Sequence, residues 1–422
     1  MQEFSIQDQQ LTLESVSLED VANQYGTPCY VYSKAALTRS YLEYSQALGE
    51  HPGKICFAVK SNSNLAVLQL LANLGASFDI VSGGEMERVL RAGGKAENII
   101  FSGVGKTKQE IIRAMDVGIY CFNVESQPEL EVISEVAHAR NQEVSISIRV
   151  NPDVDANTHP YISTGLKENK FGIDFEAAPA VFQRAKELPG IKVSGVDCHI
   201  GSQITELSPF MDALDRLLVL IDQLAELSIT IEHLDLGGGL GVTYKDEVLP
   251  SIAEYIAKVK ERLGDRKLAL LFEPGRSISA NAGALITEVI YTKLTAHRNF
   301  AIVDAAMNDN LRPALYQAWQ EIRPVTTGSD AEEQQWDIVG PVCETSDFLA
   351  KDRALSIKAG DRLALMSAGA YGFTMSSNYN SRGRAAEVLV DGDKHYLIRK
   401  RENFEDIIQG EYLLEEQITD TP

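Results

Sequence analysis

Eight short apolar runs alternate with longer amphipathic segments between residues 54 and 285 of this chain. Each run is rich in β-branched or aromatic residues and closes on Ser, Asn, Gly or Pro, as buried parallel strands do. The runs are residues 55–59, 78–81, 99–101, 121–124, 144–150, 193–200, 234–236 and 268–272. Strand–helix alternation builds right-handed βαβ units. Eight units predict an α/β fold with a closed (β/α)8 barrel, and an open doubly wound sheet is the alternative.

The sequence after residue 285 has a different pattern. Strand-like segments separated by turns predict a mainly β domain there, and they lie at residues 286–293, 300–304, 337–339, 362–366 and 386–398. Residues 29–32 form a further strand candidate that can join this domain. We therefore predict a barrel domain at 33–285 and a β-rich domain made of 1–32 and 286–422.

Charge and cysteine content exclude several classes of protein. The 422 residues include 39 Lys and Arg against 60 Asp and Glu, a formal net charge of −21. An acidic chain is a poor partner for nucleic acid, because neutralising phosphates needs clustered basic residues. No run approaches the roughly 18 apolar residues of a membrane span. Five cysteines without CxxC spacing predict reduced thiols in the cytoplasm and no metal site.

Polar residues follow several of the predicted strands, where α/β barrels gather their functional side chains. Lys60 follows the first run. A buried lysine there can have its pKa lowered and attack a carbonyl group, whereas a lysine that emerges into solvent does neither. His199 follows the sixth run, and Gly201 and Ser202 beside it would allow contact with an anion. A purely structural histidine is the alternative.

Three glycines at 237–239 follow the seventh run, so that backbone N–H groups can point at a phosphate; a plain tight turn is the alternative. After the eighth run, Glu273 and Arg276 flank a Pro-Gly turn and can simply pair with each other. In the later part of the chain, Cys343 is either functional or a buried structural thiol.

Two segments come close to nucleotide-binding motifs, but neither one has all the glycines that its motif requires. The dinucleotide pattern GxGxxG lacks its third glycine, because Tyr244 stands at that position. The segment 103–107 resembles a P-loop, but Ile100 stands where the first glycine is required. We expect this second segment to start a helix instead.

Taken together and in order, these motifs resemble those of the diaminopimelate decarboxylase family, pyridoxal 5′-phosphate enzymes of the alanine-racemase-like fold. The likeness covers roughly residues 20–415. It implies a pyridoxal-phosphate-binding barrel, a C-terminal β domain and a homodimer with shared active sites. It is carried by Ala58-Val59-Lys60, Ser82-Gly83-Gly84-Glu85, Asn169-Lys170-Phe171-Gly172, His199-Ile200-Gly201-Ser202-Gln203, the glycines at 237–239, Glu273-Pro274-Gly275-Arg276, Cys343-Glu344 and Ala370-Tyr371-Gly372.

The resemblance also implies a role for each site residue. Lys60 resembles the lysine that holds the cofactor, His199 the imidazole stacked on its ring, and Glu273 the carboxylate that faces its pyridine nitrogen. The phosphate contacts would come from Ser202, Gly238, Gly275, Arg276 and Tyr371. The substrate contacts would come from Arg276, Arg312, Tyr316, Glu344 and Tyr371. Cys343 resembles the proton donor that the partner subunit supplies.

The implied reaction is the decarboxylation of meso-2,6-diaminopimelate to L-lysine and CO2, the last step of lysine biosynthesis. Two guanidinium groups and a carboxylate suit an amino-acid head group at the far end of a substrate. The main alternative is a decarboxylase of ornithine, arginine or carboxynorspermidine, which lack that head group. A homeostasis protein on the same barrel and a racemase are further alternatives. The loop 155–170 is either a lid over the substrate or a static surface loop.

Overall fold

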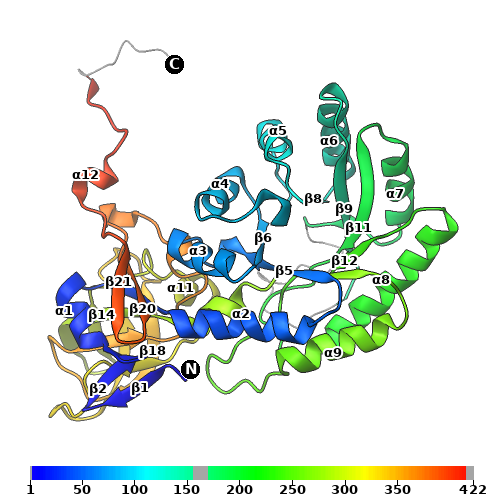
Figure 1. Cartoon of the computed structure of the whole chain (residues 1–422). Coiled ribbons are helices and arrows are strands. Elements are labelled where there is room, and N and C mark those ends of the chain that lie inside the picture. The colour runs from blue at the N-terminus through cyan, green and yellow to red at the C-terminus, as the bar shows by residue number, and fades with distance from the viewer. Residues whose placement is uncertain (1, 155–169, 415–422) are drawn as a thin grey trace. The chain divides into compact units, whose positions relative to one another are not determined.

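The computed structural model describes residues 2–154 and 170–414 of the chain (Figure 1). The chain divides into two compact units. The first unit comprises Met1–Phe4, Ser33–Gly283 and Ser367–Thr374, and the second comprises Ser5–Tyr32, Ala284–Met366 and Met375–Pro422. Almost all of the loop 155–170 lies outside the described residues, so the structure does not test whether this loop is a lid or a static surface loop.

The first unit contains a closed barrel of parallel strands. Each strand pairs with the next one along the chain, and β13 pairs with β5 to close the ring. The predicted (β/α)8 barrel is therefore confirmed and the open sheet is excluded. The strands are β5 (Gly53–Ala58), β6 (Ser77–Ile80), β7 (Ile99–Phe101), β8 (Cys121–Val124), β9 (Val144–Asn151), β11 (Ile191–Asp197), β12 (His233–Asp235) and β13 (Ala269–Phe272).

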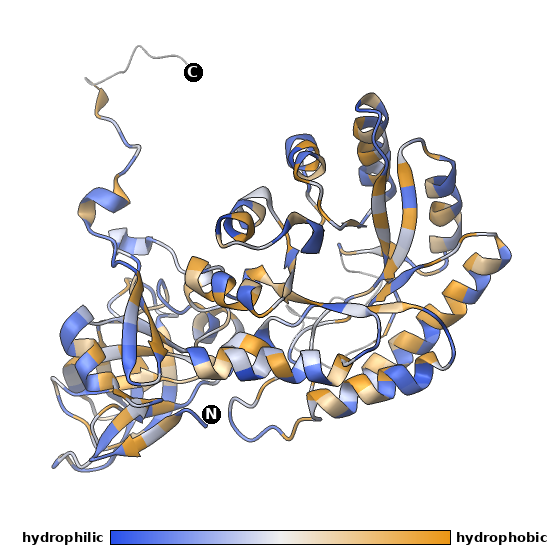
Figure 2. Cartoon of the chain, viewed as in Figure 1, coloured by the Kyte–Doolittle hydropathy of each residue, from blue (hydrophilic) through white to orange (hydrophobic). Residues whose placement is uncertain are grey.

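Helices alternate with these strands along the chain, and five of them begin at an N-cap residue of a type that the sequence shows. Side chains of Asn64, Ser82, Thr107, Ser126 and Ser251 each accept a backbone N–H in the first turn of the helix that follows. Figure 2 shows hydrophobic and hydrophilic residues on different sides of α8 and α9. The helices are α2 (Lys34–Leu48), α3 (Leu65–Asn73), α4 (Gly83–Arg91), α5 (Lys108–Val117), α6 (Gln127–Ala139), α7 (Ala178–Glu187), α8 (Ser208–Glu226), α9 (Ile252–Leu263) and the short α10 (Arg276–Ser279).

The second unit is built on a mixed sheet, as the strand-and-turn pattern predicted. Its strands run in the order β18-β17-β15-β14-β4-β20-β21, and β19 pairs with both β14 and β16. The strand predicted at 29–32 is β4 (Cys29–Ser33), and it joins this sheet. The others are β14 (Gly283–Leu294), β15 (Asn299–Val303), β16 (Ile322–Pro324), β17 (Gln334–Val339), β18 (Phe348–Leu355), β19 (Arg362–Leu365), β20 (Ala386–Asp391) and β21 (Lys394–Arg399).

Two strands of this sheet, β16 and β18, were not predicted from the sequence. β18 carries charged residues at its centre, because that stretch is exposed, and β16 is three residues long and ends in proline. The chain also begins with a small three-stranded sheet of β1 (Phe4–Gln7), β2 (Gln10–Leu13) and β3 (Val16–Ser17). The remaining helices are α1 (Leu18–Tyr25), α11 (Arg312–Tyr316) and α12 (Phe404–Ile407). Within the part of the chain that the structure describes, no helix is long and apolar enough to cross a membrane.

Candidate active site

Lys60 lies one residue past the end of β5, in a short 3-10 turn (Val59–Ser61). Its side chain is 34% exposed, and its Nζ forms an ion pair with the fully buried Asp79 of β6. Burial by itself lowers the pKa of Lys60, but the carboxylates of Asp79 and Glu273 outweigh it and raise that pKa above its usual range. The lowered pKa that the sequence suggested is therefore wrong for the free protein, because the sequence did not reveal the neighbouring Asp79.

The glycines at 237–239 follow β12 and pass close to other backbone segments. Gly237 and Gly239 have φ of 63° and 108°, in the left-handed region that favours glycine. A Cβ on Gly238 would lie 2.3 Å from the carbonyl oxygen of Glu273, and one on Gly239 would lie 2.6 Å from that of Gly201. Larger residues would push this turn away from the strand ends, so only glycines allow the cradle at 237–239 to lie this close to the backbone of Gly201 and Glu273.

His199 lies against this cradle. The N–H of Gly238 donates to Nδ1 of His199 at 3.1 Å, so that nitrogen carries no proton. Burial lowers the pKa of His199 well below its usual value, and the positive charges of Arg149 and Lys60 lower it further. The ring is consequently a neutral imidazole with its proton on Nε2, which is a suitable flat surface for an aromatic ligand.

Glu273 follows β13 and is buried. Its Oε1 accepts hydrogen bonds from Ser102 Oγ at 3.4 Å and from Asn123 Nδ2 at 3.3 Å. Burial, followed by the charges of Asp235 and Asp79, raises the pKa of Glu273 well above its usual value. The raised pKa favours the protonated, neutral form of this carboxyl group.

Arg276 begins α10 and contacts two predicted site residues, Ser202 and Tyr371, as well as Tyr244, which was not predicted. Its Nε and Nη2 each lie 3.2 Å from Ser202 Oγ, and its guanidinium group stacks on the ring of Tyr371 at 4.8 Å from the centroid. Its Nη1 donates to Tyr244 Oη at 2.6 Å. Among the described residues, the simple ion pair between Glu273 and Arg276 that the sequence allowed is not formed.

The segment that carries Tyr371 belongs to the first unit and is tied to the turn of Lys60. The N–H of Tyr371 donates to the carbonyl oxygen of Ser61 at 2.9 Å. Gly275 lies against the same turn, since a Cβ there would be 3.0 Å from Ser61 Cβ. The predicted cofactor residues of the first unit, Lys60, His199, Ser202, Gly238, Glu273, Gly275, Arg276 and Tyr371, thus line the ends of β5, β11, β12 and β13.

The other four predicted residues lie in the second unit. Arg312 and Tyr316 are both on α11, where the Arg312 side chain is buried. Cys343 is exposed, so the alternative of a buried structural thiol is wrong. The backbone N–H of Cys343 donates to Asn380 Oδ1 at 2.9 Å, and Tyr379 Oη donates to Glu344 Oε1 at 2.9 Å.

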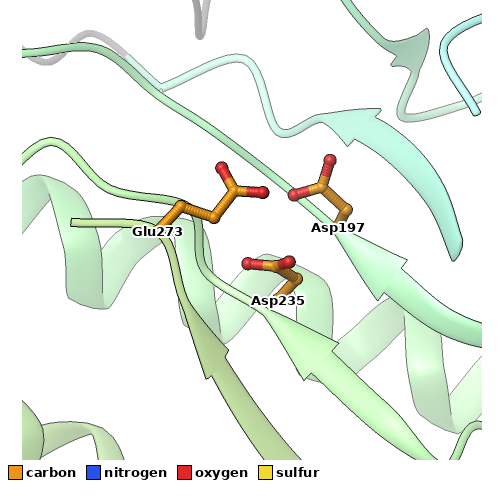
Figure 3. Close-up of side chains that lie close together, drawn as sticks. All are labelled: Asp197, Asp235 and Glu273. Carbon is orange, nitrogen blue, oxygen red and sulfur yellow. The ribbon is translucent and has the colours of Figure 1, made fainter. Parts of the chain in front are cut away.

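The sequence motifs missed three buried carboxyl groups at the barrel strand ends. Asp79, Asp197 and Asp235 are each at most 2% exposed, and they end or nearly end β6, β11 and β12. Carboxyl oxygens of Asp197, Asp235 and Glu273 all lie within 4.8 Å of one another, and Figure 3 shows these side chains pointing toward one another. The available signal was a single charged residue inside an otherwise apolar run, which strand patterning alone cannot assign to a site.

A second missed group supports the site from the neighbouring loops. Arg149 of β9 and Glu125 form a buried ion pair of 2.8 Å, and Glu125 also accepts the N–H groups of Gly103 and Gly172. Lys106, in the segment that resembled a P-loop, is fully buried and donates to Gly103 O, Asn123 O and Glu129. Thr107 caps α5, as expected of a helix start.

Comparison with known proteins is consistent with this geometry. Residues 34–280 match the family described as "Pyridoxal-dependent decarboxylase, pyridoxal binding domain". The diaminopimelate decarboxylase of Pseudomonas aeruginosa is 59% identical over 98% of this chain and 100% of its own length.

Solved structures resemble nearly the whole chain as well. The diaminopimelate decarboxylase of M. jannaschii in co-complex with L-lysine has a TM-score of 0.93 at 37% identity, covering 98% of this chain and 99% of its own. The Helicobacter pylori diaminopimelate decarboxylase complexed with L-lysine has a TM-score of 0.90 at 43% identity, covering 93% of this chain and 98% of its own. The likeness therefore extends through both units.

Proposed function

The chain belongs to the diaminopimelate decarboxylase family of pyridoxal-dependent enzymes, and on this basis we propose that it converts meso-2,6-diaminopimelate into L-lysine and CO2. The observation that carries the proposal is the convergence at one end of the barrel of an amine (Lys60), a glycine cradle (237–239) and a buried acid (Glu273). These three suit the aldehyde, the phosphate and the ring nitrogen of pyridoxal 5′-phosphate.

The residues present fit this cofactor. The glycine turn packs directly on the strand end that carries Glu273, because a Cβ at Gly238 would lie 2.3 Å from the Glu273 carbonyl oxygen. Ser202, Gly238, Gly275, Arg276 and Tyr371 would hold the phosphate, and Lys60 would hold the aldehyde carbon through Nζ. When bound, pyridoxal phosphate supplies the electron sink that stabilises the charge left at Cα after CO2 departs.

The chain's own residues prepare the site for this chemistry. His199 offers a neutral ring face, because its Nδ1 already accepts the Gly238 N–H. Arg276 is fixed by Ser202 and Tyr244, so its planar group is oriented before any ligand arrives. Burial favours the protonated form of the Glu273 carboxyl group.

Substrate binding is assigned to Arg276, Arg312, Tyr316, Glu344 and Tyr371. The two guanidinium groups would bind the distal carboxylate and Glu344 would bind the distal ammonium. Cys343 would donate the proton to Cα from the partner subunit of a homodimer. Its exposure on the isolated chain supports this role, because a thiol that serves another subunit must lie at the surface.

Two coarser features complete the proposal. We assign residues 33–285 to the cofactor-binding domain and residues 1–32 with 286–422 to the β-rich domain, with the correction that 367–374, which carry Tyr371, belong to the cofactor-binding unit. We also assign the protein to the cytoplasm, and the five free cysteines support this assignment.

The second candidate function is decarboxylation of ornithine, arginine or carboxynorspermidine. These substrates have no distal amino-acid head group, so Arg312 would have no carboxylate to bind. The presence of Arg312 together with Arg276 and Glu344 favours the diaminopimelate reaction, because two guanidinium groups and a carboxylate suit such a head group.

The deciding experiment is a substrate panel with the purified full-length protein and added pyridoxal phosphate. Lysine and CO2 should form in equal amounts from meso-diaminopimelate, and ornithine, arginine and carboxynorspermidine should give at least about 100-fold lower kcat/KM. Faster turnover of one of those three would replace the proposed substrate. Absence of both cofactor binding and turnover would overturn the proposed chemistry.

A further inference from the structure

More buried acids than bases lie at the C-terminal ends of the barrel strands. The five carboxyl groups are those of Asp79, Glu125, Asp197, Asp235 and Glu273, and the two cations are Lys60 and Arg149. Lys60 pairs with Asp79, and Arg149 pairs with Glu125. Asp197, Asp235 and Glu273 are left within 4.8 Å of one another (Figure 3). Three adjacent buried carboxylates cannot all be ionised without a large electrostatic penalty.

Hydrogen bonding around these three groups also requires protons. Asp235 Oδ1 accepts the N–H of Gly237 at 2.9 Å. Asp235 Oδ2 and Asp197 Oδ1 are buried and receive no N–H or hydroxyl donor from the described residues. The same holds for Oδ1 of the fully buried Asn123, whose Nδ2 donates to Glu273. Buried acceptors without donors are rare in folded proteins, so protons on the carboxyl groups are the simplest remedy.

Carboxyl oxygens of Glu273 and Asp235 lie within 4.8 Å of each other. A direct hydrogen bond between two carboxyl groups exists only when one of them carries a proton. Burial raises the pKa of Asp235 to about 7, and burial followed by the charge of Asp235 raises that of Glu273 well above its usual value. The shared proton is placed on Glu273, because Asp235 Oδ1 already serves as the acceptor for the Gly237 N–H. The titratable and charged groups around it are Lys60, Cys56, Asp79, Arg149, Asp197, Cys198 and Asp235.

We propose that Asp235 is a positioning residue that keeps Glu273 protonated in the cofactor-free protein while it anchors the glycine cradle through Gly237. This inference rests on the proposed function, because the proton is meant for the ring nitrogen of the cofactor. Glu273 would be able to give this proton to a neutral ring nitrogen of the cofactor. Glu273 would then be a carboxylate and the ring a cation, so their summed charge would be unchanged. No proton would have to enter a buried site from water.

Asp235→Asn separates the two roles of Asp235. The amide keeps the size of the side chain and an oxygen for the Gly237 N–H, but it removes the negative charge and the shared proton. A residue that only anchors the cradle would tolerate this change. A residue that sets the charge of Glu273 would not, because Glu273 would lose its proton at lower pH.

The first test is infrared spectroscopy of the cofactor-free, full-length protein between pH 5 and 10. The carbonyl stretching band of a protonated carboxyl group should be present at pH 7.5, and Glu273→Gln should remove part of it. In Asp235→Asn that part should disappear about one pH unit or more below its midpoint in the parent protein. Asp222→Asn, an exposed aspartate paired with Arg266, is the matched control and should leave the midpoint unchanged.

The outcomes are distinct. Absence of a Glu273 band in the parent protein, or equal midpoints in the parent and Asp235→Asn, would overturn the proposal. A stoichiometric divalent metal in the purified protein would overturn it too, since a cation would then neutralise the carboxylates. Adding pyridoxal phosphate to the parent protein should remove the Glu273 band, and its persistence would refute the transfer. The measurement on the cofactor-free protein uses no substrate, so it succeeds or fails independently of lysine formation.

Discussion

Lys60 and Cys343 represent two kinds of reactive side chain in this chain. Lys60 is held by Asp79, which raises its pKa, so it remains charged until a ligand displaces that contact. Cys343 is exposed. Among the described residues, its backbone N–H donates one hydrogen bond, to Asn380 Oδ1. The lysine is therefore prepared by its own barrel, whereas the thiol depends on what approaches it.

Lys60→Ala should abolish both the visible absorbance of bound pyridoxal phosphate and the formation of lysine. The variant removes the only proposed covalent attachment of the cofactor, while the exposed Lys258→Ala, which breaks a surface pair with Glu254, should change neither. Absorbance spectra and lysine assays on both variants check this. Retained activity in Lys60→Ala would remove Lys60 from the mechanism.

Cys343→Ala should keep the cofactor spectrum but lower kcat by about 10²-fold or more, because general acid catalysis by one side chain contributes about this much. Thr345→Ala in the same exposed segment is the control and should behave as the parent protein. Steady-state kinetics with diaminopimelate measure the effect. If kcat is unchanged, another group protonates Cα.

The elements that build the site are strand ends. Parallel strands bring their C-terminal ends to the same edge, so residues far apart in sequence, such as Lys60 after β5 and Glu273 after β13, become neighbours. The turn after β12 contains the three glycines at 237–239, and it packs closely on the loops after β11 and β13.

Gly238→Ala should weaken binding of pyridoxal phosphate by at least about 10-fold and leave the barrel folded. The new Cβ would lie 2.3 Å from the Glu273 carbonyl oxygen, so the cradle must move away from the strand end. Gly105→Ala, where an added Cβ meets nothing within 4 Å, is the control. Equilibrium titration of the cofactor followed by absorbance gives both affinities, and circular dichroism reports the fold. Equal affinities would show that the cradle does not contact the phosphate.

At the scale of the whole molecule, the proposed cofactor residues lie in the first unit, whereas Arg312, Tyr316, Cys343 and Glu344 lie in the second. A division of this kind allows the active site to be completed by a second copy of the chain. The proposed homodimer is therefore testable by combining defects from the two units.

Mixing Lys60→Ala with Cys343→Ala should restore activity if each site takes its lysine from one subunit and its cysteine from the other. Random exchange of subunits leaves one intact site in half of the dimers, so the recovered activity should be about a quarter of the parent value. Each variant alone, incubated in the same way, is the control. Sedimentation or light scattering establishes the dimer independently, and no recovery in an exchanging dimer would assign both residues to one subunit.

The sequence by itself determined the barrel and most of the second sheet, and it proposed the site residues that stand in contiguous motifs. Runs of β-branched and aromatic residues predict strands because burial on both faces requires them, and residues such as Ser202 and Glu273 follow directly in the chain. β18 was not predicted because its centre is exposed and charged.

Only the tertiary structure decided the electrostatics of the site. Asp79, Asp197 and Asp235 are single acids in separate strands, and nothing in the order of residues says that they meet at the same end of the barrel. The pKa of Lys60 depends on the nearby Asp79 rather than on its own segment. The lowered pKa considered from the sequence is therefore wrong, because the charge of Asp79 raises it. Charge interactions depend on distance and burial in space, and these exist only after the chain has closed into the barrel.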